Sequence, residues 1–397
     1  PSAEAGQSPD PMASMADMEA QDRWMTMTHG YAFVTFNTQG GPSGGDAFES
    51  VNHFMAMSMR RFAGGKLSLL GAWTVEPVTV EQGGSPELFQ RGETYRGALL
   101  VDRQHPHDLF VELALRWERP LSRTTAFILY LSPWGEPAVG PTAYPHRLSA
   151  SENPTAPLAH HNQDSTHISA DVVTAGMRLA KVTLEGSAFH GREPDENRYD
   201  IDQGAIDSYS GRLTFRPTGG LAIQISAARR EHPESIEPGD QTRQTFSVEY
   251  ARGTPGGFLA ASLLVGRNLL PEGPEWGNGL EATWKFRDRN FLYGRVESVD
   301  RDVTELLDKR QRPPGIAPRR TVVQAVTLGY VRNIPLVSRL ETGVGGGLTV
   351  YRQDAALDPA YGRRPVSGQA FLRIRFGAHG GADHAHAGPA HDHGGGV

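Results

Sequence analysis

Apolar and polar side chains alternate with a period of two residues in many windows of this chain, and no other feature constrains its fold as strongly. Residues 219–230 are typical. Leu221 and Ile223 lie on one face of an extended segment, and Gln224 and Ser226 lie on the other. A helix repeats every 3.6 residues or so and cannot sustain this order. Each such window therefore predicts a β-strand with one apolar and one polar face.

The same test along the whole chain predicts about sixteen strands, each about long enough to cross a membrane when tilted by roughly 45°. The expected strands lie near residues 30–38, 51–62, 66–76, 109–118, 122–132, 165–178, 181–191, 207–216, 219–230, 243–252, 257–267, 278–287, 290–300, 321–332, 338–351 and 366–376. The side chains expected to face lipid include Val111, Leu113, Leu115, Leu221, Ile223, Ile225, Leu372 and Ile374. The opposite faces carry charges such as Arg373 and Arg375, which a water-filled lumen would solvate.

The connections between the expected strands alternate in length. Tight links such as Ala63-Gly64-Gly65, Arg119-Pro120-Leu121 and Leu179-Ala180 follow every second strand, and the intervening links run from about ten to over thirty residues. Transmembrane barrels combine short periplasmic turns with long extracellular loops in this way. An even strand count then places both chain ends on the periplasmic side. The alternative is a water-soluble sandwich or propeller, but no blade-length repeat is present.

Composition narrows the classes of function. The chain has no cysteine, which excludes thiolate metal sites and cysteine nucleophiles. Its net charge is −6, and acidic and basic residues are interspersed along the sequence. No basic face for binding nucleic acid is therefore expected. The 14 residues 253–266 form the longest stretch without a charge, too short for a spanning helix, which needs about 20 apolar residues. No basic and apolar leader precedes Pro1, and we expect export to have removed a signal peptide.

Residues 30–376 resemble the porin-type β-barrels of bacterial outer membranes. The resemblance rests on the strand rhythm, the loop asymmetry and the final strand Phe371–Phe376, which is similar to the aromatic-ended strand that the barrel-insertion machinery recognises. The sequence departs from that pattern because it continues for 21 residues after Phe376. The resemblance implies membrane lipid, lipopolysaccharide and the insertion machinery as partners, and leaves monomer and trimer open. Trp117, Trp284 and Tyr330 lie near strand ends, where an interfacial aromatic girdle would sit.

Two terminal segments flank the expected barrel of residues 29–376. Segment 1–28 contains the series Met12, Met15 and Met18, which suits either a soft Cu(I) site or an amphipathic helix packed on the barrel. Segment 377–397 is expected to be a flexible tail that weakly binds Cu, Zn or Ni, or that serves only as a solubilising extension. The histidines of this tail are His379, His384, His386, His391 and His393. These Met and His clusters resemble those of copper-resistance outer-membrane proteins, but no cofactor is required.

Two long loops are rich in polar and titratable residues, and we expect at least one of them to fold into the lumen and form a constriction. The residues concerned in loop 95–108 are Asp102, Arg103, His105, His107 and Asp108, and those in loop 133–164 are Tyr144, His146, Arg147, His160, His161 and Asp164. Their expected anchors on the wall are Glu112, Arg116, Glu281 and Lys285. Loop–loop hydrogen bonding at the rim, or a metal site, are alternatives.

Together these features predict an outer-membrane channel for passive diffusion of small polar solutes or ions, with a link to metal handling. A structural or adhesin-type barrel without transport is the first alternative. A lipase-type outer-membrane enzyme is the second, although the spacing identifies no nucleophile, base and orienting group. We expect no enzymatic activity.

Overall fold

A computed structural model of the chain describes residues 23–234, 239–271, 273–307 and 317–377. Sixteen strands close into one antiparallel barrel, as the alternation predicts. They are β1 (Met25–Gln39), β2 (Asp46–Phe62), β3 (Gly65–Trp73), β6 (Phe110–Pro120), β7 (Thr125–Gly135), β8 (Ser169–Leu179), β9 (Val182–His190), β10 (Ser208–Thr218), β11 (Leu221–Arg230), β12 (Gln241–Thr254), β13 (Gly257–Leu270), β14 (Gly273–Phe286), β15 (Asn290–Asp302), β16 (Arg320–Asn333), β17 (Glu341–Arg352) and β18 (Val366–Phe376).

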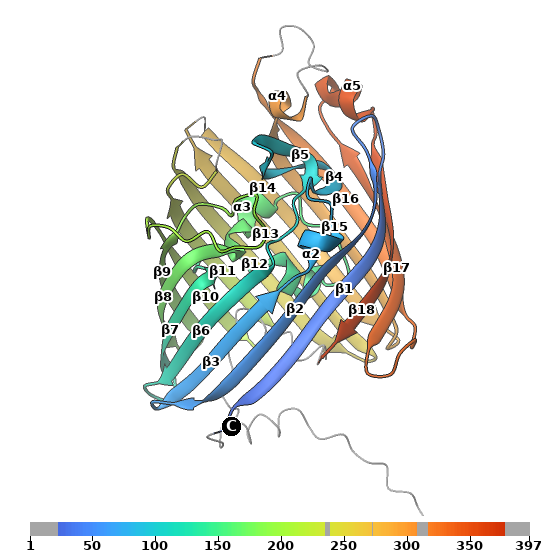
Figure 1. Cartoon of the computed structure of the whole chain (residues 1–397). Helices are drawn as coiled ribbons and strands as arrows, with labels where there is room; N and C mark the ends of the chain where they lie inside the picture. Colours follow the sequence, from blue (N-terminus) through green and yellow to red (C-terminus); the bar gives the residue numbers. More distant parts are fainter. Residues whose placement is uncertain (1–22, 235–238, 272, 308–316, 378–397) are drawn as a thin grey trace, which may run out of the picture.

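Each barrel strand pairs with its neighbours in chain order, except that β3 pairs with β6 across an inserted hairpin. The register Gly30↔Phe376 to Gln39↔Ser367 joins β1 to β18 and closes the barrel. The tight turns, the start of β1 and the end of β18 lie at one end of the barrel, and the long connections lie at the other (Figure 1). At one of these turns, Ala63 (φ 50°) and Gly64 (φ 73°) both adopt the left-handed conformation that a tight hairpin requires.

The two faces of the wall differ as the sequence predicts. Leu263, Leu280, Val296 and Val326 lie side by side on four neighbouring strands and are between 42% and 53% exposed, so they form an apolar outer belt. Arg373 on β18 points inward and is fully buried. An outer face with large exposed hydrophobic side chains fits lipid and would be costly in water.

Some strand boundaries differ from the prediction. The barrel begins at Met25 rather than at residue 29, because residues 25–28 continue the ladder with β2. The expected strand 66–76 ends at Trp73, and the expected strand 165–178 begins only at Ser169, after a 3₁₀ turn. The connection between β13 and β14 was expected to be long, but it spans only residues 271 and 272 because both strands extend beyond the alternating windows.

The segment expected to be the loop Tyr95–Asp108 contains a strand. β4 (Ser85–Tyr95) and β5 (Ala98–Gln104) form a two-stranded sheet, which we call the inner hairpin. It lies inside the barrel, towards the end that carries the long loops (Figure 1). Leu88 and Phe89 are fully buried there, in an apolar cluster that includes side chains of β15, β16 and β17.

Val111 does not face lipid, although the sequence pattern predicts that it does. The register between β3 and β6 shifts at this point, since Ala72 pairs with Glu112 but Trp73 pairs with Phe110. Val111 is the extra residue of this bulge, and it is buried with Ala72 and Trp134. A bulge reverses the alternation locally, which a period-two pattern does not anticipate.

The remaining described elements are single helical turns. They are α2 (Glu76–Thr79), η1 (Tyr144–His146), η2 (Leu148–Ala150), α3 (His160–Gln163), η3 (Ser165–His167), α4 (Val303–Leu306), η4 (Ala355–Leu357) and α5 (Asp358–Tyr361). None of these described helices has the length and apolar character needed to cross a membrane.

A charge introduced into the outer belt should destabilise the barrel. Leu280→Arg places a guanidinium in lipid near the middle of β14, which should lower the free energy of unfolding by about 2–4 kcal/mol. Leu280→Ala is the control and should cost less than the arginine. Urea unfolding in lipid vesicles measures both variants, and equal stability of Leu280→Arg and the parent would mean that this face is not in lipid.

Candidate functional site: a histidine ring inside the barrel

Residues 136–168, which we call the luminal loop, fold into the barrel and bind its inner wall. Arg147 is fully buried and links the loop to itself and to the wall. Its Nε lies 2.7 Å from Glu281 Oε1 on β14, and its Nη1 lies 2.5 Å from Asp164 Oδ2 at the other end of the loop. Burial alone raises the pKa of Asp164, but the Arg147 guanidinium outweighs it and holds the pKa below its ordinary value.

A second anchor joins the luminal loop to the last strand. Glu152 is fully buried between Arg373 and Arg375, and its Oε1 lies 2.7 Å from Arg375 Nη1. Its other oxygen accepts from Arg373 Nη1. One carboxylate therefore binds two inward-facing arginines, and Glu341 supplies further negative charge to both.

Wall arginines also hold the loop backbone. Arg295 Nη1 donates to the carbonyl of Ala156 over 2.9 Å, and Arg301 Nη2 donates to the carbonyl of Leu158 over 2.6 Å. Charged donors to carbonyls form stronger hydrogen bonds than neutral donors do. These contacts hold residues 147–164 of the loop against the inner wall, which confirms the prediction that it folds into the lumen.

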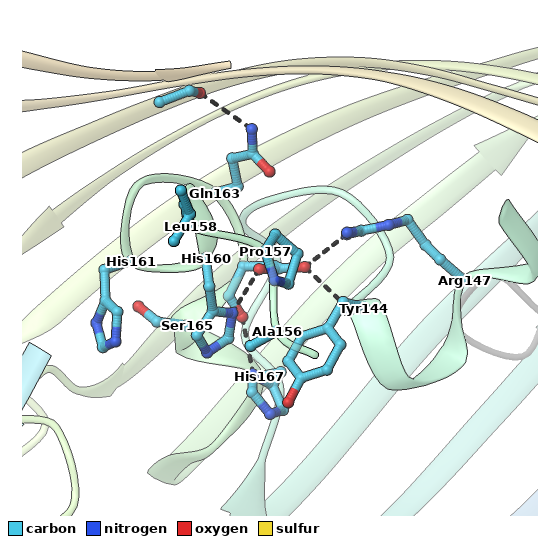
Figure 2. A network of polar contacts seen from close by, with 12 residues as sticks. Tyr144, Arg147, Ala156, Pro157, Leu158, His160, His161, Gln163, Ser165 and His167 are labelled. Carbon is cyan, nitrogen blue, oxygen red and sulfur yellow. Dashed lines mark hydrogen bonds and ion pairs between the residues drawn. The ribbon is translucent and has the colours of Figure 1, made fainter. Parts of the chain in front are cut away.

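Five histidines form a closed ring between the luminal loop and the chain that follows the inner hairpin. Neighbouring ring centroids are 6.1 Å apart for His105–His107, 5.3 Å for His107–His167 and for His167–His160, 5.1 Å for His160–His161 and 5.9 Å for His161–His105. Figure 2 shows His160, His161 and His167 on the short helical turns of the luminal loop. The sequence brings them together because α3 and η3 follow each other directly.

Acidic residues hold several of these rings. His107 Nδ1 lies 2.8 Å from Glu76 Oε2, and His160 Nδ1 lies 2.7 Å from Asp164 Oδ1. Burial opposes the charged form of His107, but the Glu76 carboxylate prevails and raises its pKa. The Tyr144 hydroxyl lies 3.3 Å from His107 Nε2, so the tyrosine also contacts the ring.

Arg198 lines the cavity beside this ring and pairs with two carboxylates, Glu93 and Asp108. Burial raises the pKa of Glu93 to about 8 and that of Asp108 to about 7, although Arg198 lowers both. One guanidinium cannot balance two buried carboxylates, so the pair retains a proton near neutral pH.

The structure assembles some of the predicted site residues and separates others. His105, His107, Asp108, Tyr144, Arg147, His160, His161 and Asp164 lie in or beside the histidine ring. The remaining candidates lie elsewhere. Asp102 accepts hydrogen bonds from Phe89 and Tyr361, and Arg103 binds Glu81 and Gly84. His146 packs on His53, Glu112 binds Tyr130, and Arg116 lies near Glu118. Of the expected wall anchors, Glu281 binds the loop. Met12, Met15, Met18 and the tail histidines lie outside the described residues.

Several residues of the site are not among the predicted ones: Glu76, Glu93, Glu193 and Arg198 were not proposed, and His167 was expected only as part of the strand 165–178. Glu76 and Glu93 belong to the segment between β3 and β6, and Glu193 and Arg198 to the connection between β9 and β10. Charged residues concentrated in long connections were the available signal, but it does not say which connections enter the lumen.

Three small polar cavities lie between the inner hairpin, the luminal loop and the wall. They measure about 20, 30 and 10 Å³, which is room for single water molecules or a few of them. The first two share Asn37, Glu87 and Thr155 in their linings, and the last two share His105 and His107. The cavities therefore form a row that ends at the histidine ring.

Solved structures of bacterial porins share this fold. The chain is similar to an anion-selective porin from Comamonas acidovorans (TM-score 0.54, 10% identity, covering 89% of this chain and 100% of the porin). It is also similar to Pseudomonas putida OprB (TM-score 0.52, 10% identity, 92% and 96% covered) and to Salmonella typhi OmpF (TM-score 0.50, 7% identity, 88% and 97% covered). No protein-family profile and no curated protein sequence matches the chain. The likeness therefore supports the porin fold.

Removing the charge of Glu152 should cost far more than breaking a surface pair. Glu152→Gln leaves Arg373 and Arg375 buried with Glu341 as their one remaining carboxylate among the described residues, so the free energy of unfolding should fall by about 3–5 kcal/mol. Asp354→Asn is the control, because Asp354 pairs with the exposed Arg319 and its loss should have no measurable effect. Urea unfolding in vesicles compares the two variants. Equal effects would mean that Glu152 does not anchor the loop.

Proposed function

We propose that the protein is a narrow channel of the bacterial outer membrane, through which small ions and small polar solutes diffuse passively. The observation that carries this proposal is the row of polar cavities along the luminal loop inside a closed, lipid-facing barrel. The small volumes of these cavities favour ions and water-sized groups over larger solutes. The start of β1 and the end of β18 would face the periplasm, because they lie at the same end of the barrel as the tight turns.

The linings of the cavities favour cations. The residues that line the three cavities include more carboxylates than guanidinium groups. The guanidinium groups are those of Arg198 and Arg295, and the carboxylates are those of Glu49, Glu76, Glu87, Glu93, Asp108, Glu193 and Glu297. Rings of acidic side chains select cations in channels by the same electrostatic principle. Solutes with a positive charge are therefore the expected cargo.

A link to metal handling belongs to the same proposal and rests on sequence composition. The Met series of segment 1–28 suits Cu(I), and the His-rich segment 377–397 suits weak binding of Cu, Zn or Ni. Lipid, lipopolysaccharide and the insertion machinery are the proposed partners. No enzymatic role is proposed, since the Ser165 hydroxyl donates to Glu193 rather than to a histidine among the described residues.

Cation preference should increase with pH. Glu93 and Asp108 have pKa values raised to about 8 and about 7, so they are protonated below these values and negative above them. The cation-to-anion permeability ratio should rise a few-fold between about pH 6 and about pH 9. Reversal potentials in planar bilayers measure it. Glu93→Gln should flatten the rise, and an unchanged pH profile in that variant would refute the assignment.

Shortening the luminal loop should widen the channel. Replacing residues 137–160 with a short Gly-Ser linker removes the Arg147 and Glu152 anchors, so single-channel conductance should rise and ion selectivity should weaken. Removing residues 335–338 is the control, because Leu336 and Val337 are exposed in a connection at the tight-turn end. Conductance that stays at the parent value after the luminal deletion would show that this loop does not limit flow.

A further inference from the structure

His161 differs from the other members of the histidine ring. Both of its ring nitrogens are buried, and neither forms a hydrogen bond with a described residue. Each of the other four rings has at least one nitrogen in contact with a carboxylate, a carbonyl or a hydroxyl oxygen. The buried imidazole of His161 therefore has no hydrogen-bond partner among the described residues. A neutral imidazole offers a nitrogen lone pair that can bind a metal ion.

Two glutamates lie beside this imidazole. Ligand atoms of His161, Glu193 and Glu234 all lie within 4.8 Å of one another. Glu193 Oε2 is 3.8 Å from His161 Nδ1, and this oxygen is buried without a hydrogen bond among the described residues. An imidazole nitrogen and a carboxylate oxygen are thus oriented towards the same small space, and neither is otherwise satisfied.

Hydrogen bonds to the second oxygen of Glu193, Oε1, orient the first oxygen, Oε2, towards His161. Glu193 Oε1 accepts from Ser165 Oγ and from Arg230 Nη2, each over 3.1 Å. Arg243 Nη1 in turn donates to Ser165 Oγ over 2.9 Å. Metal-binding carboxylates are commonly oriented by hydrogen bonds of this kind to the oxygen that does not bind the ion.

Glu234 reaches the same space from a different connection. The backbone N–H of Glu193 donates to the carbonyl of Pro233 over 2.9 Å, and this bond joins the connection between β9 and β10 to the connection between β11 and β12. Glu234 follows Pro233 directly, so the bond holds its side chain near Glu193. Figure 2 shows His161 on the Ser165 side of the luminal loop, away from Tyr144.

We propose that His161, Glu193 and Glu234 bind a divalent transition-metal ion of the Zn²⁺ class. One neutral imidazole and two carboxylates give a net charge of −2, which a divalent cation balances, and this mixed nitrogen and oxygen set suits Zn²⁺ or Co²⁺ better than Cu(I) or Mg²⁺. Ligand atoms of a tetrahedral Zn²⁺ ion lie about 3.3 Å apart, so a small rotation of the glutamate side chains completes the site. A water molecule would occupy the fourth position.

Metal binding here would connect three separate segments of the chain. His161 belongs to the luminal loop, and the two glutamates belong to different connections at the long-loop end. The ion would hold the luminal loop to these connections by bonds that do not involve the barrel wall. Binding is measured without transport, so the result does not depend on the channel proposal.

Calorimetric titration with Zn²⁺ and visible absorption with Co²⁺ test the site on the full chain in detergent. The parent for this test has alanine in place of His379, His384, His386, His391 and His393, so that the tail does not compete. We expect one ion for each chain and a tetrahedral Co²⁺ spectrum. His161→Gln, Glu193→Gln and Glu234→Gln should each weaken binding by about tenfold or more.

Asp200→Asn is the matched control. Asp195, Asp200 and Asp202 also bring carboxylate oxygens within 4.8 Å of one another, but they form an acidic surface group without an imidazole, so this variant should bind Zn²⁺ like the parent. Far-ultraviolet circular dichroism and heat-modifiable gel mobility show which variants retain the barrel. The proposal is overturned if the parent binds neither ion, or if folded Glu193→Gln and Glu234→Gln bind Zn²⁺ as tightly as the parent.

Discussion

Glu152 binds two arginines that the closed barrel forces inward, with Glu341 as their second carboxylate, and the interior of the protein depends on this pairing. Arg373 and Arg375 alternate with apolar residues on β18, so they must point into the lumen if the strand is to face lipid. Water would solvate them in an open pore, but here the luminal loop displaces it. A buried guanidinium without a carboxylate costs several kcal/mol, so the loop that excludes water must also supply the negative charge.

The same requirement explains how the rest of the luminal loop is arranged. Arg147 of the loop binds Glu281 of the wall, and Arg295 and Arg301 of the wall bind loop carbonyls. Charges of both signs thus lie on both sides of the boundary between loop and wall. The inner hairpin uses a different interaction, because Leu88 and Phe89 pack in an apolar cluster near the long-loop end. Polar pairing holds the loop, and apolar packing holds the hairpin.

The sequence predicts the barrel well and the interior only in part. Period-two alternation identifies strands and faces because each strand is short, and lipid demands an apolar outer surface regardless of other contacts. The alternation fails at Val111, where a bulge reverses the faces, and it does not reveal the inner hairpin. It also underestimates β13 and β14, since their ends extend beyond the alternating windows.

The histidine ring shows why a site of this kind is only half visible in a sequence. His105, His107, His160, His161 and His167 are conspicuous because they are close together in two short segments, so composition alone marks those segments. Glu193 lies in a separate connection, and only the position of that connection relative to the luminal loop makes it a neighbour of His161. No local pattern encodes this proximity, because it depends on the register of the intervening strands.

Pairing between loop, hairpin and wall is incomplete around one of the small cavities. Among the residues lining the middle cavity, Thr35 Oγ1, Glu49 Oε2 and Gln104 Oε1 are buried without a hydrogen-bond partner in the described part of the chain. Such atoms are commonly satisfied by buried water, and the cavity has room for it. Arg147 and Glu152 bind the wall elsewhere in the lumen, while water-sized space remains beside these three atoms. In the proposed channel, an ion would therefore follow these unsatisfied groups, and their acidic neighbours would favour cations.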